Sequence, residues 1–205
     1  MSEPLARVTA LHRPPERVRV VTAASLFDGH DAAINIMRRI LQAQGAEVIH
    51  LGHDRSVDEI ASAAVQEDAH AVAVSSYQGG HMEFFRYLVD RLRELGAPDV
   101  RVFGGGGGTI TAAEARELEA YGVAKIFGPA DGRALGLEGM IRTILEACDR
   151  RTIERVGDEL ERLSPAHPLA VARLITYLEE GGAAGGPAVE ALRAQLDARR
   201  AGPPA

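Results

Sequence analysis

Short runs of β-branched and other apolar residues alternate with amphipathic segments of helical period between residues 17 and 150. This alternation is typical of βαβ units that build a parallel sheet. The first and third runs are nearly all apolar, as expected of strands that helices cover on both faces. The pattern predicts five strands: Val18–Thr22, Glu47–Leu51, Ala71–Ser75, Val100–Phe103 and Lys125–Phe127.

Signals at helix ends support the predicted helices independently of hydrophobicity. Ser56 and Thr111 each precede a glutamate by three residues, at Glu59 and Glu114, which is the capping-box pattern of a helix start. Glycines that suit helix ends follow the helical runs at Gly45, Gly96 and Gly122. Five βα units with right-handed crossovers predict a flavodoxin-like α/β fold, with strand order 2-1-3-4-5 and helices on both faces of the sheet. Ligands of such a sheet bind at the carboxyl ends of its strands.

Beyond residue 150 the strand pattern ends and helical runs alternate with helix breakers. The spacing predicts three helices, with apolar stripes at Ile153, Val156, Leu160 and Leu163, then Leu174, Ile175 and Leu178, then Val189, Leu192 and Leu196. We therefore divide the chain into a tail (1–16), a ligand-binding domain (17–150) and a helical extension (151–205). The extension ends in a linker-like Gly202-Pro203-Pro204-Ala205, and we expect it to lead towards a further domain.

The composition narrows the choice of partner and compartment. The chain has 23 basic and 29 acidic residues, a formal net charge of -6, and no stretch concentrates Lys or Arg as nucleic acid would demand. It shows neither a secretory signal nor an apolar run of about 18 residues, and its single cysteine, Cys148, cannot close an intrachain disulfide. We expect a cytoplasmic protein with no nucleic-acid or membrane partner.

Candidate chemistry begins in the loop after the first strand, at 25–31. Asp28 and His30 are spaced so that the carboxylate can accept a hydrogen bond from one imidazole nitrogen while the other faces a ligand. An alternative stays open, in which Asp28 caps the following helix and His30 merely opens it. The spacing alone does not decide between these interpretations.

Two further loops reach the same edge of the predicted sheet. Ser75, Ser76 and Tyr77 lie at the end of the third strand, and five glycines, Gly104 to Gly108, follow the fourth. Consecutive glycines let the backbone approach a large flat ligand closely, although they also suit a flexible turn. Small and hydroxyl residues on these loops would line a slot beside the histidine loop.

Several functions that are common among flavodoxin-like folds are not supported, because this chain lacks the residues that they require. A phospho-receiver domain needs an acidic residue where this chain has Ser75 and Ser76. A dinucleotide site needs its glycines after the first strand, and a P-loop needs a Gly-Lys-Ser/Thr ending, which the glycine run lacks. Neither serine lies in a Gly-x-Ser-x-Gly elbow, so nothing supports a hydrolase.

Taken together, Asp28-Gly29-His30, Ser75-Ser76-Tyr77 and the glycine run resemble the Asp-x-His-x-x-Gly, Ser-x-Leu and Gly-Gly motifs of cobalamin-binding domains. The resemblance covers residues 17–150. It is nearest to the N-terminal cobalamin domain of the fused isobutyryl-CoA mutases, adenosylcobalamin-dependent enzymes in which a G-protein chaperone domain and a mutase barrel follow. The short tail before the domain fits that placement.

Three positions depart from the family pattern. Ala33 stands where the first motif usually ends in glycine, and Tyr77 stands where many members have leucine. Both can modify how the nucleotide tail of the cofactor fits. Ala24 occupies the place of a lysine that methylmalonyl-CoA mutases carry, which favours the isobutyryl branch.

The resemblance implies that the chain binds adenosylcobalamin with the cofactor's own base detached from cobalt. His30 would supply the lower axial nitrogen to cobalt, and Asp28 would accept from the other ring nitrogen and fix the tautomer. Ligation needs a neutral imidazole, so it should weaken as His30 protonates. The implied cofactor contacts are Asp28, Gly29, His30, Asp31, Ser75, Tyr77, Gly104, Gly105 and Gly106.

The same resemblance implies a module of an isomerase, the coenzyme carrier of a radical acyl-CoA mutase. A substrate barrel needs about 250 residues, so we expect no catalytic residue here and no mutase activity from this chain alone. The implied partners are cobalamin, the mutase barrel and the G-protein chaperone domain, in one chain or as separate subunits. Leu26, Phe27 and Tyr77 would face the barrel, or else pack within their own loops.

Two other functions stay open. A corrinoid module of a methyltransferase or of a cobalamin-sensing regulator would use the same motifs, although such modules usually carry a helical bundle upstream of the Asp-x-His motif. A protein-interaction domain without a cofactor is the third possibility, which failure to retain any corrinoid would favour. Among the other residues, we expect His53 and His81 on loops at the ligand edge, His12, His70 and His167 on the surface, and Cys148 in the core.

Overall fold

The computed structural model describes residues 17–181 and 186–200. Its five strands form one parallel sheet of order β2-β1-β3-β4-β5, so the predicted flavodoxin-like topology is confirmed. The strands are β1 (Arg19–Ser25), β2 (Glu47–Arg55), β3 (Ala71–Ser75), β4 (Arg101–Gly105) and β5 (Lys125–Phe127). All five predicted strands are present, and β1, β2 and β4 extend further towards the ligand edge than the hydrophobic pattern predicts.

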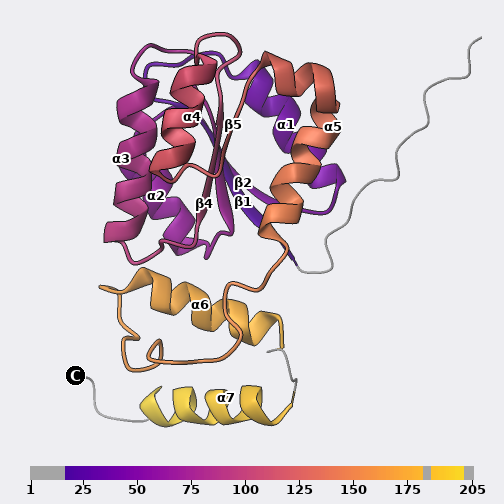
Figure 1. Ribbon diagram of the computed structural model, residues 1–205. Coiled ribbons are helices and arrows are strands. Elements are labelled where there is room, and N and C mark those ends of the chain that lie inside the picture. The colour runs from indigo at the N-terminus through magenta and orange to yellow at the C-terminus, as the bar shows by residue number, and fades with distance from the viewer. Residues whose placement is uncertain (1–16, 182–185, 201–205) are drawn as a thin grey trace, which may run out of the picture.

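Helices cover both faces of the sheet, with α2, α3 and α4 on one side and α1 and α5 on the other (Figure 1). They are α1 (Ala32–Ala43), α2 (Val57–Gln66), α3 (His81–Glu94), α4 (Ala112–Tyr121) and α5 (Pro129–Cys148). Both predicted capping boxes form, because the hydroxyl groups of Ser56 and Thr111 accept from the N–H groups of Glu59 and Glu114.

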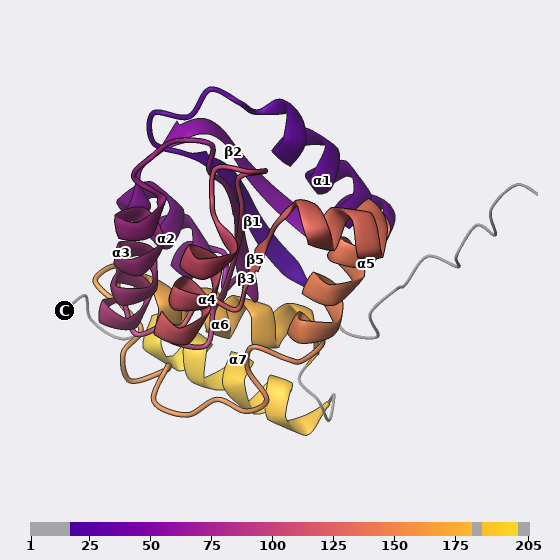
Figure 2. The same ribbon diagram turned by 45° about the horizontal axis from the view of Figure 1, so that its top comes forward.

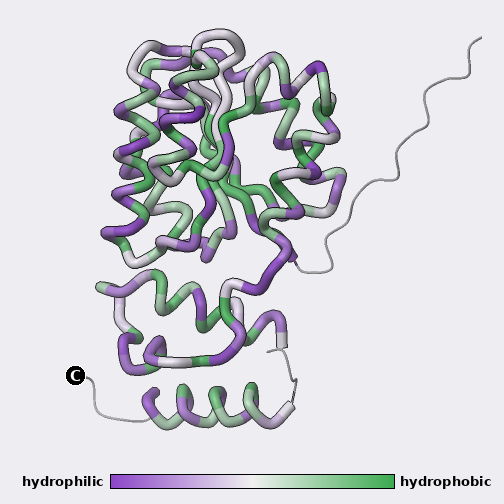
Figure 3. Tube along the Cα trace, in the orientation of Figure 1, coloured by the Kyte–Doolittle hydropathy of each residue, from purple (hydrophilic) through white to green (hydrophobic). Residues whose placement is uncertain are grey.

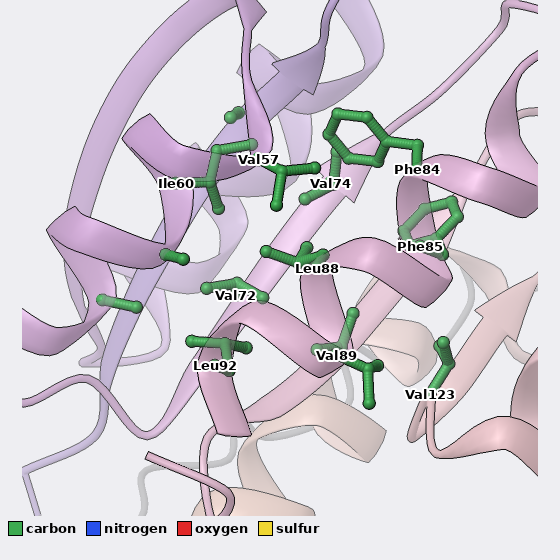
Figure 4. Packing of buried hydrophobic residues seen from close by; sticks show 14 of the residues in the cluster. Val57, Ile60, Val72, Val74, Phe84, Phe85, Leu88, Val89, Leu92 and Val123 are labelled. Carbon is green, nitrogen blue, oxygen red and sulfur yellow. The ribbon is translucent and has the colours of Figure 1, made fainter. Parts of the chain in front are cut away.

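Each face of the sheet buries its own apolar cluster, which explains why the strands read as nearly continuous hydrophobic runs. Phe85 and Leu88 of α3 pack with Ile60 of α2 on one face (Figure 4). On the other face, Phe103 and Phe127 pack with α1 and α5, and the cluster includes the fully buried, predicted core residue Cys148. Figure 3 shows the hydrophobic residues gathered along the strands between the two helical layers.

The extension contributes two helices, α6 (Pro168–Glu179) and α7 (Pro187–Arg200), which lie below the amino ends of the strands (Figures 1 and 2). The first of the three predicted helices, over the stripe from Ile153 to Leu163, is wrong, because 151–167 forms turns and bends. Gly157 interrupts this short segment, and a helix of that length is marginal without help from packing. Its apolar positions are nevertheless used, since they pack against α6 and α7.

Buried polar contacts tie the extension to the sheet. The Arg19 guanidinium donates to the Glu67 carbonyl at 2.5 Å and to the Thr176 hydroxyl of α6 at 2.8 Å. His70, expected on the surface, is only 1% exposed: its Nδ1 accepts from the Arg19 N–H at 3.1 Å, and its Nε2 lies 2.8 Å from the Arg150 carbonyl. The surface prediction for His70 is wrong because backbone partners satisfy both ring nitrogens, which a sequence pattern does not reveal.

Several predictions concern residues outside those described, namely the tail at 1–16 with His12, the glycine-rich stretch at 182–185 and the ending at 201–205. The division of the chain at residue 150 stays a prediction. His167 is exposed, as expected. Within 17–181 and 186–200, no helix has both the length and the apolar character needed to cross a bilayer.

Candidate functional site

The carboxylate of Asp28 holds together two loops at the carboxyl edge of the sheet. Its Oδ1 accepts from the backbone N–H of His30 at 2.8 Å and lies 2.9 Å from the His30 Nδ1, and its Oδ2 accepts from the backbone N–H of Tyr77 at 2.6 Å. The side chain of Asp28 is fully buried. Helix α1 begins after Asp31, whose side chain makes no capping hydrogen bond. Asp28 therefore orients the histidine instead of capping the helix.

The His30 imidazole is presented to solvent in a defined tautomer. A carboxylate can only accept, so Nδ1 carries a proton, and in the neutral ring Nε2 then holds the free lone pair. The ring is 76% exposed and lies 5.5 Å from the Tyr77 ring, centre to centre. Gly29 and Asp31 flank it, with open space where a Gly29 side chain would be. The arrangement offers one oriented nitrogen donor to a ligand above the sheet edge.

Serine side chains and backbone bonds join the ends of three strands below this loop. The Ser25 hydroxyl donates to the Ser76 hydroxyl at 3.0 Å, and the Ser76 N–H donates to the Gly105 carbonyl at 2.8 Å. Ser75 is only 5% exposed, and its hydroxyl oxygen has no hydrogen-bond partner in the described part of the chain. Because buried polar groups are normally paired, this hydroxyl is available to a bound molecule.

A cavity of about 320 Å³ lies between α1 and α5 above β3, β4 and β5, with Ser75 in its wall. Its other walls are chiefly apolar side chains and glycine backbone, and Tyr77 lies at its edge. Helix α5 bends at Gly136 (φ 65°, ψ 176°), next to the lining residue Leu137. Residues that define the apolar walls are Ile34, Met37, Phe103, Phe127, Met140 and Ile141.

The glycine run serves the fold as well as the cavity. A Cβ on Gly104 would lie 2.3 Å from the Phe85 ring in the core beneath α3, and one on Gly106 would lie 1.9 Å from the Ser76 carbonyl oxygen. A Cβ on Gly105 would come nearest to the Phe127 carbonyl oxygen, at 3.1 Å, which calls for a smaller adjustment. Packing alone therefore already requires glycine at 104 and 106, whereas at Gly105 the predicted close approach of the backbone to a ligand remains a separate reason for glycine.

Other loop predictions have mixed outcomes. His53 lies within β2, although exposed, because that strand continues beyond its predicted end. His81 opens α3 and is 4% exposed, with its Nδ1 3.2 Å from the Gln78 carbonyl, so its predicted place on an open loop is wrong. Phe27 (84%) and Tyr77 (37%) are exposed, whereas Leu26 packs partly against the core.

Sequence reasoning missed Asp54 at the end of β2. Its Oδ1 accepts from the backbone N–H of Phe27 at 2.7 Å, so it contacts the loop that carries Asp28 and His30. A lone acidic residue in a strand gives no signal of such a contact, because only the parallel pairing of β1 and β2 brings the two loops together.

The fold and the site define an α/β ligand-binding domain that offers a histidine nitrogen beside an apolar cavity. The B12 binding domain family matches residues 18–137, and the chain belongs to this family. The fused isobutyryl-CoA mutase of Geobacillus kaustophilus is 59% identical over 192 residues, which cover 90% of this chain and 18% of that protein. That of Cupriavidus metallidurans is 56% identical over 170 residues, which cover 83% of this chain and 16% of that protein.

A solved structure agrees on the fold. A cobalamin-binding protein from Desulfitobacterium hafniense superposes with a TM-score of 0.54 at 22% identity, covering 64% of this chain and 60% of that one. The chain is thus a cobalamin-binding module homologous to a segment of the fused isobutyryl-CoA mutases, and it spans less than a fifth of the length of those two relatives.

The residues present fit cobalamin on the chemistry of their donors. His30 Nε2 is a neutral nitrogen of the kind that cobalt accepts, because Asp28 holds the proton on Nδ1. The cavity supplies apolar walls for an aromatic nucleotide base, and the unpartnered Ser75 hydroxyl can bond to polar atoms of the tail. Buried apolar space with a few placed polar groups is what a cofactor site requires.

Proposed function

We propose that this chain binds adenosylcobalamin with the cofactor's own base detached from cobalt and with His30 as the lower axial ligand. It would act in the cytoplasm as the coenzyme-carrying module of an acyl-CoA mutase of the isobutyryl-CoA type. The observation that carries the proposal is the pair formed by Asp28 and His30, in which a fully buried carboxylate lies 2.9 Å from the Nδ1 of an exposed imidazole.

The residues of this chain bind and orient. Asp28 keeps the proton on His30 Nδ1, so that Nε2 can ligate, and it ties the imidazole to the Tyr77 loop. The apolar cavity that would take the nucleotide tail is lined in part by Ser75, Tyr77, Gly104, Gly105 and Gly106. Gly29 and Asp31 flank the axial ligand.

The bound cofactor supplies homolysis of a cobalt–carbon bond, which starts radical rearrangement of an acyl-CoA substrate. The chain itself supplies no barrel of the usual size of about 250 residues, so we expect no turnover of isobutyryl-CoA by this chain alone. Exposed Phe27 and Tyr77 border the axial ligand and would face a mutase barrel. That barrel and a G-protein chaperone domain are the proposed partners, in the same polypeptide or as separate subunits.

The decisive test of histidine ligation is the paramagnetic resonance spectrum of bound cob(II)alamin, on protein uniformly labelled with nitrogen-15 and on unlabelled protein. We expect the axial nitrogen splitting to change with the label and to disappear in His30→Ala. His53→Ala is the matched control, because His53 is also exposed and lies in the neighbouring strand β2. A splitting that ignores the label would show that cobalt keeps the cofactor's own base, and the proposed ligation would be wrong.

A further inference from the structure

Two residues with left-handed backbone conformation are hydrogen-bonded to each other beside the histidine loop. Phe27 has φ 64° and Asp54 has φ 58°, and the Phe27 N–H donates to Asp54 Oδ1 at 2.7 Å. Bulky residues rarely adopt positive φ, so this conformation of Phe27 needs support from its surroundings. Phe27 is 84% exposed, which means that packing of its ring supplies little of that support.

The irregular end of β2 brings Asp54 to this position. The pairing of β1 with β2 shifts register after Thr22 and again after Ala23, and Gly52 has φ 87°. Bulges of this kind turn a strand and re-aim its side chains. The parallel arrangement then sets the end of β2 beside the loop that follows β1, as the view onto the top of the molecule shows (Figure 2).

The conformation of Phe27 determines where the next residues point. The chain turns back at this residue, so that the Asp28 N–H donates to the Ser25 carbonyl at 3.0 Å. The turn places the Asp28 side chain in the interior, where it meets the Tyr77 N–H, and leaves the His30 imidazole outside. An acceptor for the Phe27 N–H therefore stabilises the arrangement in which Asp28 is buried and His30 is exposed.

We propose that Asp54 is a positioning residue for cobalt ligation: its hydrogen bond with Phe27 holds the loop in the conformation that presents His30 Nε2 to cobalamin. The inference rests on the proposed function. It predicts that loss of the Asp54 acceptor loosens the loop in the free protein and reduces the share of bound cobalamin that His30 ligates. In the described part of the chain Asp54 is hydrogen-bonded to Phe27 and does not line the cavity, so its effect passes through Phe27 and Asp28.

Three variants separate the acceptor from the backbone conformation. Asp54→Asn keeps an acceptor oxygen and tolerates positive φ, Asp54→Gly keeps only the freedom of φ, and Asp54→Ala loses both. Glu161→Ala, which removes an exposed carboxylate from the extension, is the control for net charge. Each variant of the 205-residue chain is measured without ligand by hydrogen exchange at the Phe27 amide. With cob(II)alamin, it is measured by titration and by the paramagnetic resonance spectrum of nitrogen-15-labelled protein.

For Asp54→Gly we expect exchange at Phe27 to accelerate and cobalamin affinity to fall, each by about threefold to tenfold, the range that one net hydrogen bond covers. The share of cobalt with a protein nitrogen should fall as well, while the melting temperature stays near that of the wild type. Asp54→Asn should restore all three readouts, and Asp54→Ala should be at least as impaired as the glycine variant.

The outcomes distinguish the two levels of the argument. If the wild type binds cobalamin without a label-sensitive splitting, the proposed ligation fails and takes this inference with it. If the wild type shows the splitting and Asp54→Gly retains it with unchanged affinity and unchanged exchange at Phe27, only the role of Asp54 is wrong. If Asp54→Gly lowered the free energy of unfolding by as much as it weakened the free energy of cobalamin binding, Asp54 would be a residue of general stability. That result would overturn the positioning role.

Discussion

Asp28 and His30 are joined twice, because one carboxylate oxygen of Asp28 lies 2.8 Å from the backbone nitrogen and 2.9 Å from the imidazole Nδ1 of the histidine. The second oxygen accepts from the Tyr77 N–H. A single buried anion thus fixes the main chain, the ring and the neighbouring loop. The imidazole is pre-oriented in the free protein, which reduces the ordering that ligand binding has to bring about.

Asp28→Asn should separate ligation from folding. An asparagine has one acceptor oxygen and places an amide NH₂ against either His30 or Tyr77, so one of the present bonds is lost. We expect cobalamin affinity to fall by about 10- to 100-fold, as for other residues that orient a metal ligand. The free energy of unfolding should fall by about 1–3 kcal/mol, with the far-ultraviolet circular dichroism retained. Cobalamin titration and urea unfolding measure the two effects.

Asp197→Asn on α7 is the matched control for Asp28→Asn, because it makes the same chemical change at an exposed position far from the loop. If the Asp28 variant kept native circular dichroism together with the wild-type affinity and cobalt spectrum, the carboxylate would have no role in ligation.

Ser75→Ala should move stability and affinity in opposite directions. The Ser75 hydroxyl is buried and has no partner among the described residues, so its removal should relieve a desolvation cost in the free chain. We expect the free energy of unfolding to stay equal or rise by up to about 1 kcal/mol, and cobalamin affinity to fall by about threefold to tenfold. Thermal unfolding of the free chain and cobalamin titration test this pair. A loss of stability with unchanged affinity would show that the hydroxyl serves the fold and not the ligand.

Gly104 and Gly105 are neighbours whose added methyl groups would enter opposite faces of the sheet. Gly104→Ala would collide with Phe85, and we expect it to lower the free energy of unfolding by about 1–3 kcal/mol. Gly105→Ala would face the cavity side and should affect cobalamin affinity more than stability. Urea unfolding and cobalamin titration of both variants make the comparison.

A double variant checks the stated cause at Gly104. Phe85→Leu replaces the ring that the new methyl group would meet with a shorter side chain. Gly104→Ala should therefore lower the free energy of unfolding less in that background than in the wild type. Additive effects of the two substitutions would mean that Phe85 is not the obstacle.

Much of this fold is predictable because its signals are local. The capping boxes at Ser56 and Thr111 lie within four residues, and the apolar runs of β3 and β5 match the strands residue by residue. The stripe at 153–163 shows the limit of such patterns. Its spacing identifies residues that become buried, but burial against α6 and α7 does not require the segment itself to be a helix.

The candidate site divides in the same way. The spacing of Asp28 and His30 permits their contact, because the two residues are close in one loop, but it equally permits a helix cap, and only the structure decides between the two. Asp54 and His70 escape prediction, since each acts through backbone groups that parallel pairing brings close from distant parts of the chain. The sequence predicts Gly104 as a ligand contact, whereas its close approach to the Phe85 ring of α3 already explains why this position is glycine.

The last prediction concerns acid. Burial is the main reason that the pKa of His70 lies below its usual 6.5, and the nearby positive charges of Arg19 and Arg150 lower it further. The hydrogen bond to the Arg150 carbonyl and the charge of Asp68 raise the pKa, but they do not reverse the shift. The neutral ring is also the one that the contacts demand, because Nδ1 accepts from the Arg19 N–H while Nε2 donates to the Arg150 carbonyl. A second proton on the ring would remove the acceptor at Nδ1.

The sign of the pH dependence follows from the lowered pKa of His70. The unfolded chain binds the proton near pH 6.5, whereas the folded chain resists it until lower pH, so stability is complete above that range and falls as the pH drops towards the folded pKa. One such group contributes at most about 1.4 kcal/mol per pH unit. The pKa of His50 is lowered too, chiefly by burial, and adds in the same direction.

Urea unfolding at about pH 7.5, 6.5 and 5.5 tests this contribution, with His70→Gln beside the wild type. Glutamine removes the titration, so the variant should be less stable at the highest pH and lose less on acidification. His50→Gln is the comparison, because it leaves His70 and its contacts with Arg19 and Arg150 intact. If His70→Gln lost stability with the same pH slope as the wild type, then His70 would not couple the docking of the extension to protonation. A smaller loss of unfolding free energy per pH unit in His70→Gln than in the wild type would support the coupling. Earlier proteolysis of α6 in the wild type than in the variant at the lowest pH would then link acid to release of the extension from the sheet. The link would run through Arg19, which contacts both His70 and Thr176 of α6.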